Sequence, residues 1–435
     1  AEAAWAVGKL TLDEPELVDA LAAAAKARVL DLTAHDLAVV AWCFARLGRL
    51  DPPLFDALAA ALQDRSAELP PKSVANLAWA FGTLQRRDKG VFEAVAGRVV
   101  GDVRSFNQQA LVNISWAFAR VSRSDPMLFD AVARALAANP AALNEQAAAN
   151  AAWAFAKAEF APADLFDALA AVVAKKGLSF NEQSIANTAW AFATVSRDDP
   201  EVFEMLSAAT RAKIWGFRAQ AISNTAWAFA KVASADDALF DTLSKAAVAS
   251  SMHGFSEQNL ANLAWAFVGL RRDDPSLFDT LSQVILADPS IFQQQSVATL
   301  AVALARVGRA QSPALWSLIG VAVRQGRLQG FGGQALANLS WVVAKAGNAD
   351  AGFLDALTSA LRGNLTALTV QDIASIVWSL PKLGCEDGAI FRDLAREAVS
   401  KVSQSSEQDI AVLARVFAAR YNNLGSLRRL PRGTS

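Results

Sequence analysis

The chain has 435 residues, of which 53% are hydrophobic and 19% charged, so it can bury a large core. Its formal net charge of -1 does not by itself indicate a polyanionic partner. The two cysteines, Cys43 and Cys385, lie too far apart in sequence to suggest a disulfide scaffold or a CxxC metal site. No uninterrupted apolar stretch reaches the roughly 18 residues of a membrane-spanning helix, so no membrane insertion is expected.

Tryptophan marks an internal repeat that runs through almost the whole chain. Most tryptophans share one register position: Trp5, Trp42, Trp79, Trp116, Trp153, Trp190, Trp227, Trp265, Trp341 and Trp378. The first six steps are each 37 residues long, and Val302 and Arg415 occupy the same position where tryptophan is missing. A repeat of this length indicates stacked helical units, because one unit cannot bury its apolar face alone.

Each unit is predicted to begin with a helix that runs through the tryptophan, as in the segment from Gln183 to Ala193. An N-capping residue stands nine positions before the tryptophan in many units. These caps are Thr33, Asn107, Asn144, Asn181, Ser256, Thr369 and Ser406. An apolar residue precedes most caps, and a second apolar residue stands five positions after the first, as in Phe106 and Leu111. This arrangement is typical of a hydrophobic staple.

A second helix is predicted to begin at Asp-Pro pairs such as Asp51-Pro52 and Asp125-Pro126, because proline fits the first helical position. No strand pattern competes with the helices. The sequence therefore predicts an all-α fold: a right-handed α-solenoid of about 11 to 12 helix-turn-helix repeats of about 37 residues, over residues 1–419. Residues 420–435 lose the pattern and are predicted to form a basic tail.

On a helical wheel, positions -7, -3, +1 and +4 from the tryptophan lie together on the side away from the core. We call these positions the polar stripe. Position +4 is basic in most units and is predicted to bind RNA phosphates through Lys9, Arg46, Arg120, Lys157, Lys231, Arg306, Lys345 and Lys382. Positions -7 and -3 are mostly amides, predicted to bind bases or sugars through Gln109, Gln146, Gln183, Gln220, Gln258, Gln295, Gln334, Asn113, Asn150, Asn187, Asn224 and Asn262.

Acidic residues lie elsewhere, on the second helix, fourteen positions after the tryptophan, as at Asp56, Asp167 and Asp241. The near-neutral total charge thus hides one helix layer with a basic and amide ridge and another with an acidic row. A ridge of donors repeated along a groove is what a polyanion requires. The small residue at +1 is expected to let such a ligand approach closely.

Several of these positions have a second interpretation that the sequence leaves open. The asparagines at -3 also suit hydrogen bonds between neighbouring repeats, and the cations at +4 also suit the negative end of a helix dipole. The tryptophans are expected to pack in the core between adjacent first helices, with base stacking as the alternative. The variable position -6, which includes Ser184, is hypothesised to discriminate between bases.

Other chemistries find little support in the sequence. The two histidines, His35 and His253, have no cysteine or carboxylate at ligand spacing. The segment Gly330-Phe331-Gly332-Gly333 precedes a predicted helix but follows no strand, so a lost helix cap is favoured over an anion site. No nucleophile and base form a recognisable pair. We therefore expect no catalytic residues, no metal, no cofactor and no enzymatic activity.

The pattern EQ-x-[LIV]-A-N-x-A-W-A-F-A followed by DP-x-LFDAL resembles the heptatricopeptide repeat and, more distantly, the octotricopeptide repeat. The resemblance covers the chain from Trp5 to about Ala419. It implies an organellar RNA-binding protein, since both repeats occur in such proteins of algae and protists. Many heptatricopeptide proteins end in a further small nuclease-like domain, and this chain shows none.

Together, the polar stripe and the resemblance predict an organellar protein that binds single-stranded RNA and stabilises or positions a transcript or a ribosomal RNA fragment. Ribosomal or other ribonucleoprotein subunits are further expected partners. The mitochondrion is slightly favoured over the chloroplast. Ala1 already lies inside a repeat, so a targeting segment is expected to precede this sequence. The alternative function is a protein-binding α-solenoid scaffold in a large assembly, because the fold alone does not decide between them.

Overall fold

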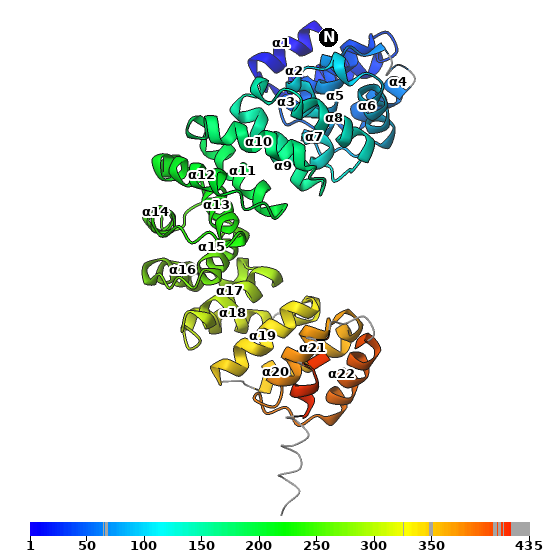
Figure 1. Cartoon of the computed structure of the whole chain (residues 1–435). Coiled ribbons are helices and arrows are strands. Elements are labelled where there is room, and N and C mark those ends of the chain that lie inside the picture. The colour runs from blue at the N-terminus through cyan, green and yellow to red at the C-terminus, as the bar shows by residue number, and fades with distance from the viewer. Residues whose placement is uncertain are drawn as a thin grey trace, which may run out of the picture. The chain divides into compact units, whose positions relative to one another are not determined.

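The computed structural model describes residues 1–63, 65, 68–324, 326–347, 351–402, 407, 410–411 and 413–418, apart from the side chains of Arg327 and Ala351. Within these ranges the regular elements are α-helices and short 3-10 turns, which confirms the all-α solenoid prediction (Figure 1). Eleven helix pairs lie between residues 2 and 401. The chain divides into two compact units, one of residues 1–217 and 231–239 and the other of residues 218–230 and 240–435.

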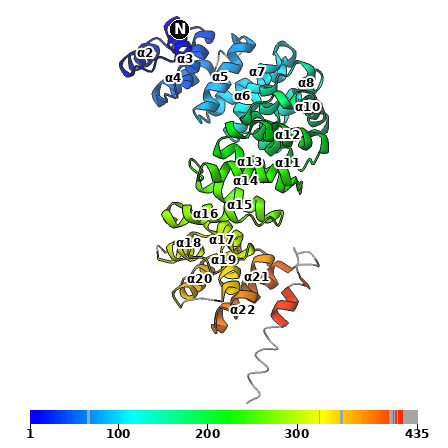
Figure 2. The same ribbon diagram turned by 90° about the vertical axis from the view of Figure 1, so that its left-hand side faces the viewer.

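In the first unit, six helix pairs follow one another along the chain. The helices are α1 (Glu2–Leu10), α2 (Pro15–Ala27), α3 (Ala34–Arg46), α4 (Pro52–Gln63), α5 (Pro71–Thr83), α6 (Lys89–Gly101), α7 (Gln108–Arg120), α8 (Pro126–Ala137), α9 (Glu145–Lys157), α10 (Ala163–Lys176), α11 (Glu182–Thr194) and α12 (Pro200–Lys213). The first helices of successive pairs, α1, α3, α5, α7, α9 and α11, pack side by side, and each second helix packs on the next one, from α2 to α12. Figure 2 shows these helices from a second side.

The second unit contains most of α13 (Ala219–Lys231) and α14 (Asp237–Ala249) and continues with four further pairs. These are α15 (Glu257–Gly269), α16 (Pro275–Ala287), α17 (Gln294–Arg306), α18 (Pro313–Arg324), α19 (Gly333–Ala346), α20 (Ala351–Asn364), α21 (Val370–Ser379) and α22 (Gly388–Lys401). Here too the first helices pack in succession, from α15 to α17, α19 and α21. The predicted basic tail, residues 420–435, and the predicted cap Ser406 lie outside the described residues.

The helices begin where the capping residues predict. The side chains of six predicted caps accept a hydrogen bond from the backbone N–H three residues on: Thr33, Asn107, Asn144, Asn181, Ser256 and Thr369. The Asp-Pro pairs act in the same way, since the Asp125 and Asp274 carboxylates accept from the N–H groups of Leu128 and Leu277. Local sequence therefore sets most helix starts.

The core is a ladder of phenylalanines that joins each repeat to the next. The phenylalanine two positions after the tryptophan packs edge-to-face on a phenylalanine of the preceding second helix. Such pairs are Phe55–Phe81, Phe92–Phe118, Phe129–Phe155, Phe166–Phe192 and Phe240–Phe267, with centroid separations of 4.9–5.3 Å. All of these rings are buried, so they contribute the apolar burial that holds neighbouring repeats together.

Adjacent first helices approach closely where their side chains are small. The +1 alanines Ala80, Ala117, Ala154, Ala191, Ala228 and Ala266 are all 0% exposed. A Cβ added at Gly82 of α5 would lie 2.8 Å from the Cα of Ala117 in α7. The expectation that small residues at +1 admit a ligand is therefore wrong, because these residues face neighbouring helices and allow the backbones to meet.

We expect Gly82→Ala to destabilise the first unit by about 1–2 kcal/mol, since the new methyl group would overlap the backbone of α7. Gly97→Ala in α6 is the matched control, because a Cβ at Gly97 meets no atom within 4 Å. It should raise the unfolding free energy by up to about 1 kcal/mol through helix propensity alone. Urea unfolding followed by circular dichroism measures both, and equal effects of the two substitutions would contradict the close approach.

Candidate nucleic-acid interface

The eight cations predicted to bind phosphates all lie exposed, at or just beyond the last turn of a first helix. We call them the cation row: Lys9, Arg46, Arg120, Lys157, Lys231, Arg306, Lys345 and Lys382. Among the residues that the structure describes, none of the eight forms an ion pair with an acid. Lys345 donates a hydrogen bond to the carbonyl of Ala305 at the end of α17, 3.0 Å away, as the helix-dipole interpretation expects.

A second set of basic residues behaves in the opposite way. The loop arginines Arg86, Arg197, Arg272 and Arg309 stand seven positions after the tryptophan register and are half-buried. Each pairs with an acid of the preceding second helix: Arg86 with Asp56 at 2.5 Å, Arg197 with Asp167 at 2.7 Å, Arg309 with Asp279 at 2.5 Å, and Arg272 with Asp241. Much of the acidic row is therefore neutralised within the repeats.

The loop arginines also stabilise the start of the next helix. Arg197 contacts Asp199, which precedes α12, at 2.6 Å, and this guanidinium holds the pKa of Asp199 below its ordinary value. Arg86 makes the equivalent contact with Asp88 at 2.7 Å. The sequence analysis missed this role. The arginines stand seven positions after a tryptophan, and their acids stand fourteen positions after the tryptophan of the preceding repeat. These two rows can be recognised in the sequence when one repeat is aligned with the next.

The predicted amides lie on the same side of the first helices as the cation row. The glutamines Gln109, Gln146, Gln183, Gln220, Gln258, Gln295 and Gln334 are exposed, and the asparagines Asn113, Asn150, Asn187, Asn224 and Asn262 are half-buried. Within the described ranges, only Asn113 has a side-chain partner among these asparagines, the Gln109 Nε2 at 2.9 Å within the same helix. Among the residues that the structure describes, no inter-repeat hydrogen bond occupies the side chains of these five asparagines, which weakens the structural interpretation of position -3.

The prediction that the tryptophans lie in the core is wrong for three of them and holds only in part for the others. The exposed fractions of Trp5, Trp265 and Trp378 are 51%, 40% and 38%, and the remaining register tryptophans are half-buried. Alanine at +1 and phenylalanine at +2 already fill the space between helices. The indole shares a helix face with position +4, because residues four apart lie on one side of a helix.

Cations and indoles meet along this face. The Lys9, Lys345 and Lys382 Nζ atoms lie 5.5, 4.9 and 3.6 Å from the ring centroids of Trp5, Trp341 and Trp378. Near the N-terminus, Lys9, Trp42, Arg46 and Trp79 line an open depression of about 340 Å³. This depression joins three consecutive repeats of the first unit, so the structure does bring cations and indoles together there.

The hypothesis that position -6 discriminates between bases is wrong at several sites. Ser73, Ser184 and Ser296 are buried, so they cannot reach a base edge. Ser73 instead contacts the His35 Nδ1 at 2.7 Å, and the buried Asp372 accepts from Thr369 in a capping box. Position -6 is the third residue of the helix, where it supports the cap or packs against the neighbouring repeat.

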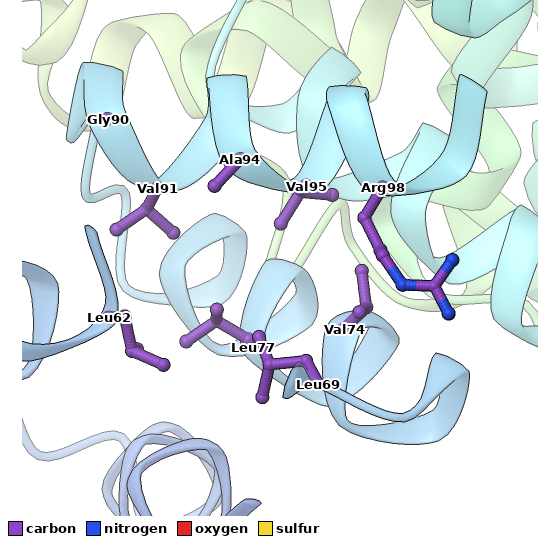
Figure 3. A pocket seen from close by; sticks show the side chains of 9 residues that line it. All are labelled: Leu62, Leu69, Val74, Leu77, Gly90, Val91, Ala94, Val95 and Arg98. Carbon is purple, nitrogen blue, oxygen red and sulfur yellow. The ribbon is translucent and has the colours of Figure 1, made fainter. Parts of the chain in front are cut away.

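The other cavities and reactive groups of the described residues do not form a second candidate binding site. An apolar cavity between α4, α5 and α6 is lined by side chains such as Leu62, Leu77 and Val95 and holds only about 10 Å³, so it is a packing gap (Figure 3).

Burial raises the pKa of the Cys43 thiol to about 11. No three potential metal ligands cluster in the described part of the chain. None of its helices is long and apolar enough to cross a membrane.

Comparison with known proteins identifies an RNA-related family. Residues 4–126 and 105–313 match the model of the family described as RNA-editing substrate-binding complex 6 protein. These matches span more than two thirds of the chain and support the coarser part of the resemblance, an RNA-associated repeat family, although the matching model is not a heptatricopeptide one.

Other comparisons add no functional information. No curated protein matches the chain. A structure described as a homology model of the full-length AP-3 complex in an intermediate open conformation is 11% identical, with a TM-score of 0.36. The alignment covers 95% of this chain and 78% of that one. A similarity at this TM-score supports no argument about function.

Proposed function

The chain belongs to the RNA-editing substrate-binding complex 6 family, and from this premise we propose that it binds single-stranded RNA as a non-catalytic subunit of an RNA-editing substrate-binding complex. The RNA is then a transcript to be edited, which the repeats hold and position. The family name favours this ligand over the ribosomal RNA fragment that the sequence resemblance also allowed. Other subunits of such a complex are the expected protein partners.

The observation that carries the proposal is the contrast between the two sets of basic residues. The loop arginines are half-buried and paired with acids, whereas the cation row is exposed and has no acidic partner within the described ranges. Structural cations are normally compensated, as the loop arginines are. A row of uncompensated cations at one register position is suited to a polymer with regularly spaced negative charges.

Single-stranded RNA fits this face better than a duplex does. The exposed glutamines and the half-buried asparagines of the polar stripe offer amide donors and acceptors beside the cations. In an RNA duplex the Watson–Crick edges of the bases are occupied and the major groove is too deep and narrow for side chains to read, whereas unpaired bases present those edges to amide side chains. We place the protein in an organelle, with the mitochondrion favoured, on the strength of the sequence resemblance.

The proposal is tested by titrating the purified chain with a labelled single-stranded RNA pool of random sequence and with a duplex of the same length. At about 50 mM salt we expect a dissociation constant of about 1 µM or tighter for the single strand and weaker binding of the duplex. Fluorescence anisotropy measures both. Absence of RNA binding at low salt would favour the protein-binding scaffold instead.

A further inference from the structure

The cation row has an aromatic neighbour in nearly every repeat. The indoles of the register tryptophans, which we call the indole row, lie on the same helix face as the cations and amides and are partly or largely open to solvent. Burial explains the phenylalanine ladder, but it does not explain Trp265 and Trp378, which remain 40% and 38% exposed. A large apolar surface left open at a repeated position indicates a ligand.

The indoles of neighbouring repeats lie in contact with one another where ring pairs are resolved. The ring centroids of Trp153 and Trp190 are 6.5 Å apart with the planes tilted by 35°, and those of Trp227 and Trp265 are 6.4 Å apart with a tilt of 32°. Separations of this size are those of aromatic pairs in contact, so the indoles of these neighbouring repeats form an apolar strip along the first helices. A base can stack on the solvent-facing side of such a strip by its flat face.

Three indoles of the row each have a lysine ammonium group over the ring. Lys382 lies 3.6 Å from the centre of the Trp378 ring, and Lys345 and Lys9 cover Trp341 and Trp5 at longer distances. A cation–π contact at an exposed site is weaker than the stacking of a base on an aromatic ring. A base can therefore displace the lysine, and the released ammonium group is then free to meet the adjoining phosphate.

We propose that the indole row stacks the unpaired bases of the RNA, with about one base per repeat, while the cation row holds the phosphates beside them. This inference rests on the proposed function and specifies how the ligand is held: by its base faces as well as by its charge. In α17 the register position is Val302 and position -3 is Thr299, so the indole row is interrupted within the second unit. Base stacking is expected to be missing at that repeat.

A peptide is the rival ligand for this face, and the charges disfavour it. An apolar peptide segment would use the indoles but leave the cations and amides without partners. Single-stranded RNA can contact the indole row, the amides and the cation row at once, because each nucleotide supplies an aromatic face, hydrogen-bonding edges and one negative charge. The peptide is therefore an outcome that the experiment must be able to reveal.

The test compares Trp265→Leu/Trp378→Leu with the wild-type chain on two probes: a single-stranded RNA and an abasic ribose-phosphate oligomer of equal length. We expect the double variant to bind the RNA about a hundredfold more weakly, about tenfold for each indole, with an unchanged dependence on salt. The abasic oligomer should bind both proteins equally and weakly. Trp265→Phe/Trp378→Phe should recover most of the RNA affinity, and Val302→Trp should strengthen it by up to about tenfold.

The control is Trp215→Leu, since Trp215 is 77% exposed but lies in the turn before α13, off the indole row. It should leave RNA affinity unchanged, and circular dichroism should show native helix content for every variant. Stacking is overturned if the wild type binds RNA and the abasic oligomer equally well, or if the double leucine variant keeps its RNA affinity. Binding of neither probe at low salt is a different failure, which removes the proposed function itself and favours a peptide ligand.

Discussion

Replacing all eight residues of the cation row by glutamine should weaken binding of single-stranded RNA by at least about a hundredfold at 50 mM salt. If about five of the eight cations contact phosphates, the logarithm of the affinity of the wild-type chain should fall with the logarithm of salt at a slope of about -3.5, since each contact contributes about -0.7. The affinity then falls about a hundredfold between 50 and 200 mM salt. The variant should show almost no salt dependence.

A smaller change tests the same idea without altering the net charge so strongly. Lys157→Ala/Lys231→Ala removes two members of the row in the first unit and should flatten the slope by about 1.4, for all RNA sequences alike. The matched control is Lys89→Ala/Arg134→Ala, because these exposed cations lie on second helices and pair with Glu93 and Asp130 of their own helices. Equal flattening by the two double variants would show that diffuse charge, and not the row, attracts the RNA.

The fold was predictable because its determinants are local and repeated. The caps at Asn107, Asn144 and Asn181 each bond a backbone N–H three residues away, within the reach of any sequence pattern. The cation row followed from the same register, since the helical wheel placed position +4 away from the core. The exposure of Lys157 and Lys382 was thus available from the sequence alone.

The tryptophans were wrongly predicted to lie in the core because their apolar character was given more weight than their position on the helical wheel. On the wheel the indole lies within about 40° of position +4, which was assigned to solvent. Its apolar character nevertheless favoured the core, although tryptophan is rarely buried completely. Phe192 is buried, whereas Trp190 is half-buried. Two positions along a helix differ by about 200°, so these two side chains lie on nearly opposite sides of α11. The phenylalanine therefore belongs to the core and the indole to the polar side.

The loop arginines were missed for a different reason. The carboxylate that pairs with Arg197 belongs to Asp167, thirty residues earlier, so no local pattern reveals the contact. Only the alignment of one repeat with the next brings Arg86, Arg197 and Arg309 opposite their acids. The sequence analysis therefore selected the cations at position +4 but gave the loop arginines no role. The structure separates cations that are used within the protein from cations that are not.

This division of roles makes opposite predictions for two residues of α11. Phe192 is 0% exposed and packs edge-to-face on Phe166 at 5.3 Å, so Phe192→Ala should cost about 3–5 kcal/mol of unfolding free energy. Trp190 is half-buried, so Trp190→Ala should cost about half as much or less. Urea unfolding gives the global values, and hydrogen exchange of the α11 amides reports the local effect, because repeat proteins open repeat by repeat.

RNA binding should reverse the order of the two substitutions. Trp190→Ala removes an indole that stacks a base and should weaken RNA binding by about tenfold. Phe192→Ala lies behind the binding face, so at a temperature where the variant is still folded its RNA affinity should change by less than about threefold. If the Trp190→Ala variant unfolds as readily as Phe192→Ala and still binds RNA normally, the indoles belong to the core and do not stack bases. Measured together, the two variants separate what holds the repeats to one another from what holds the ligand.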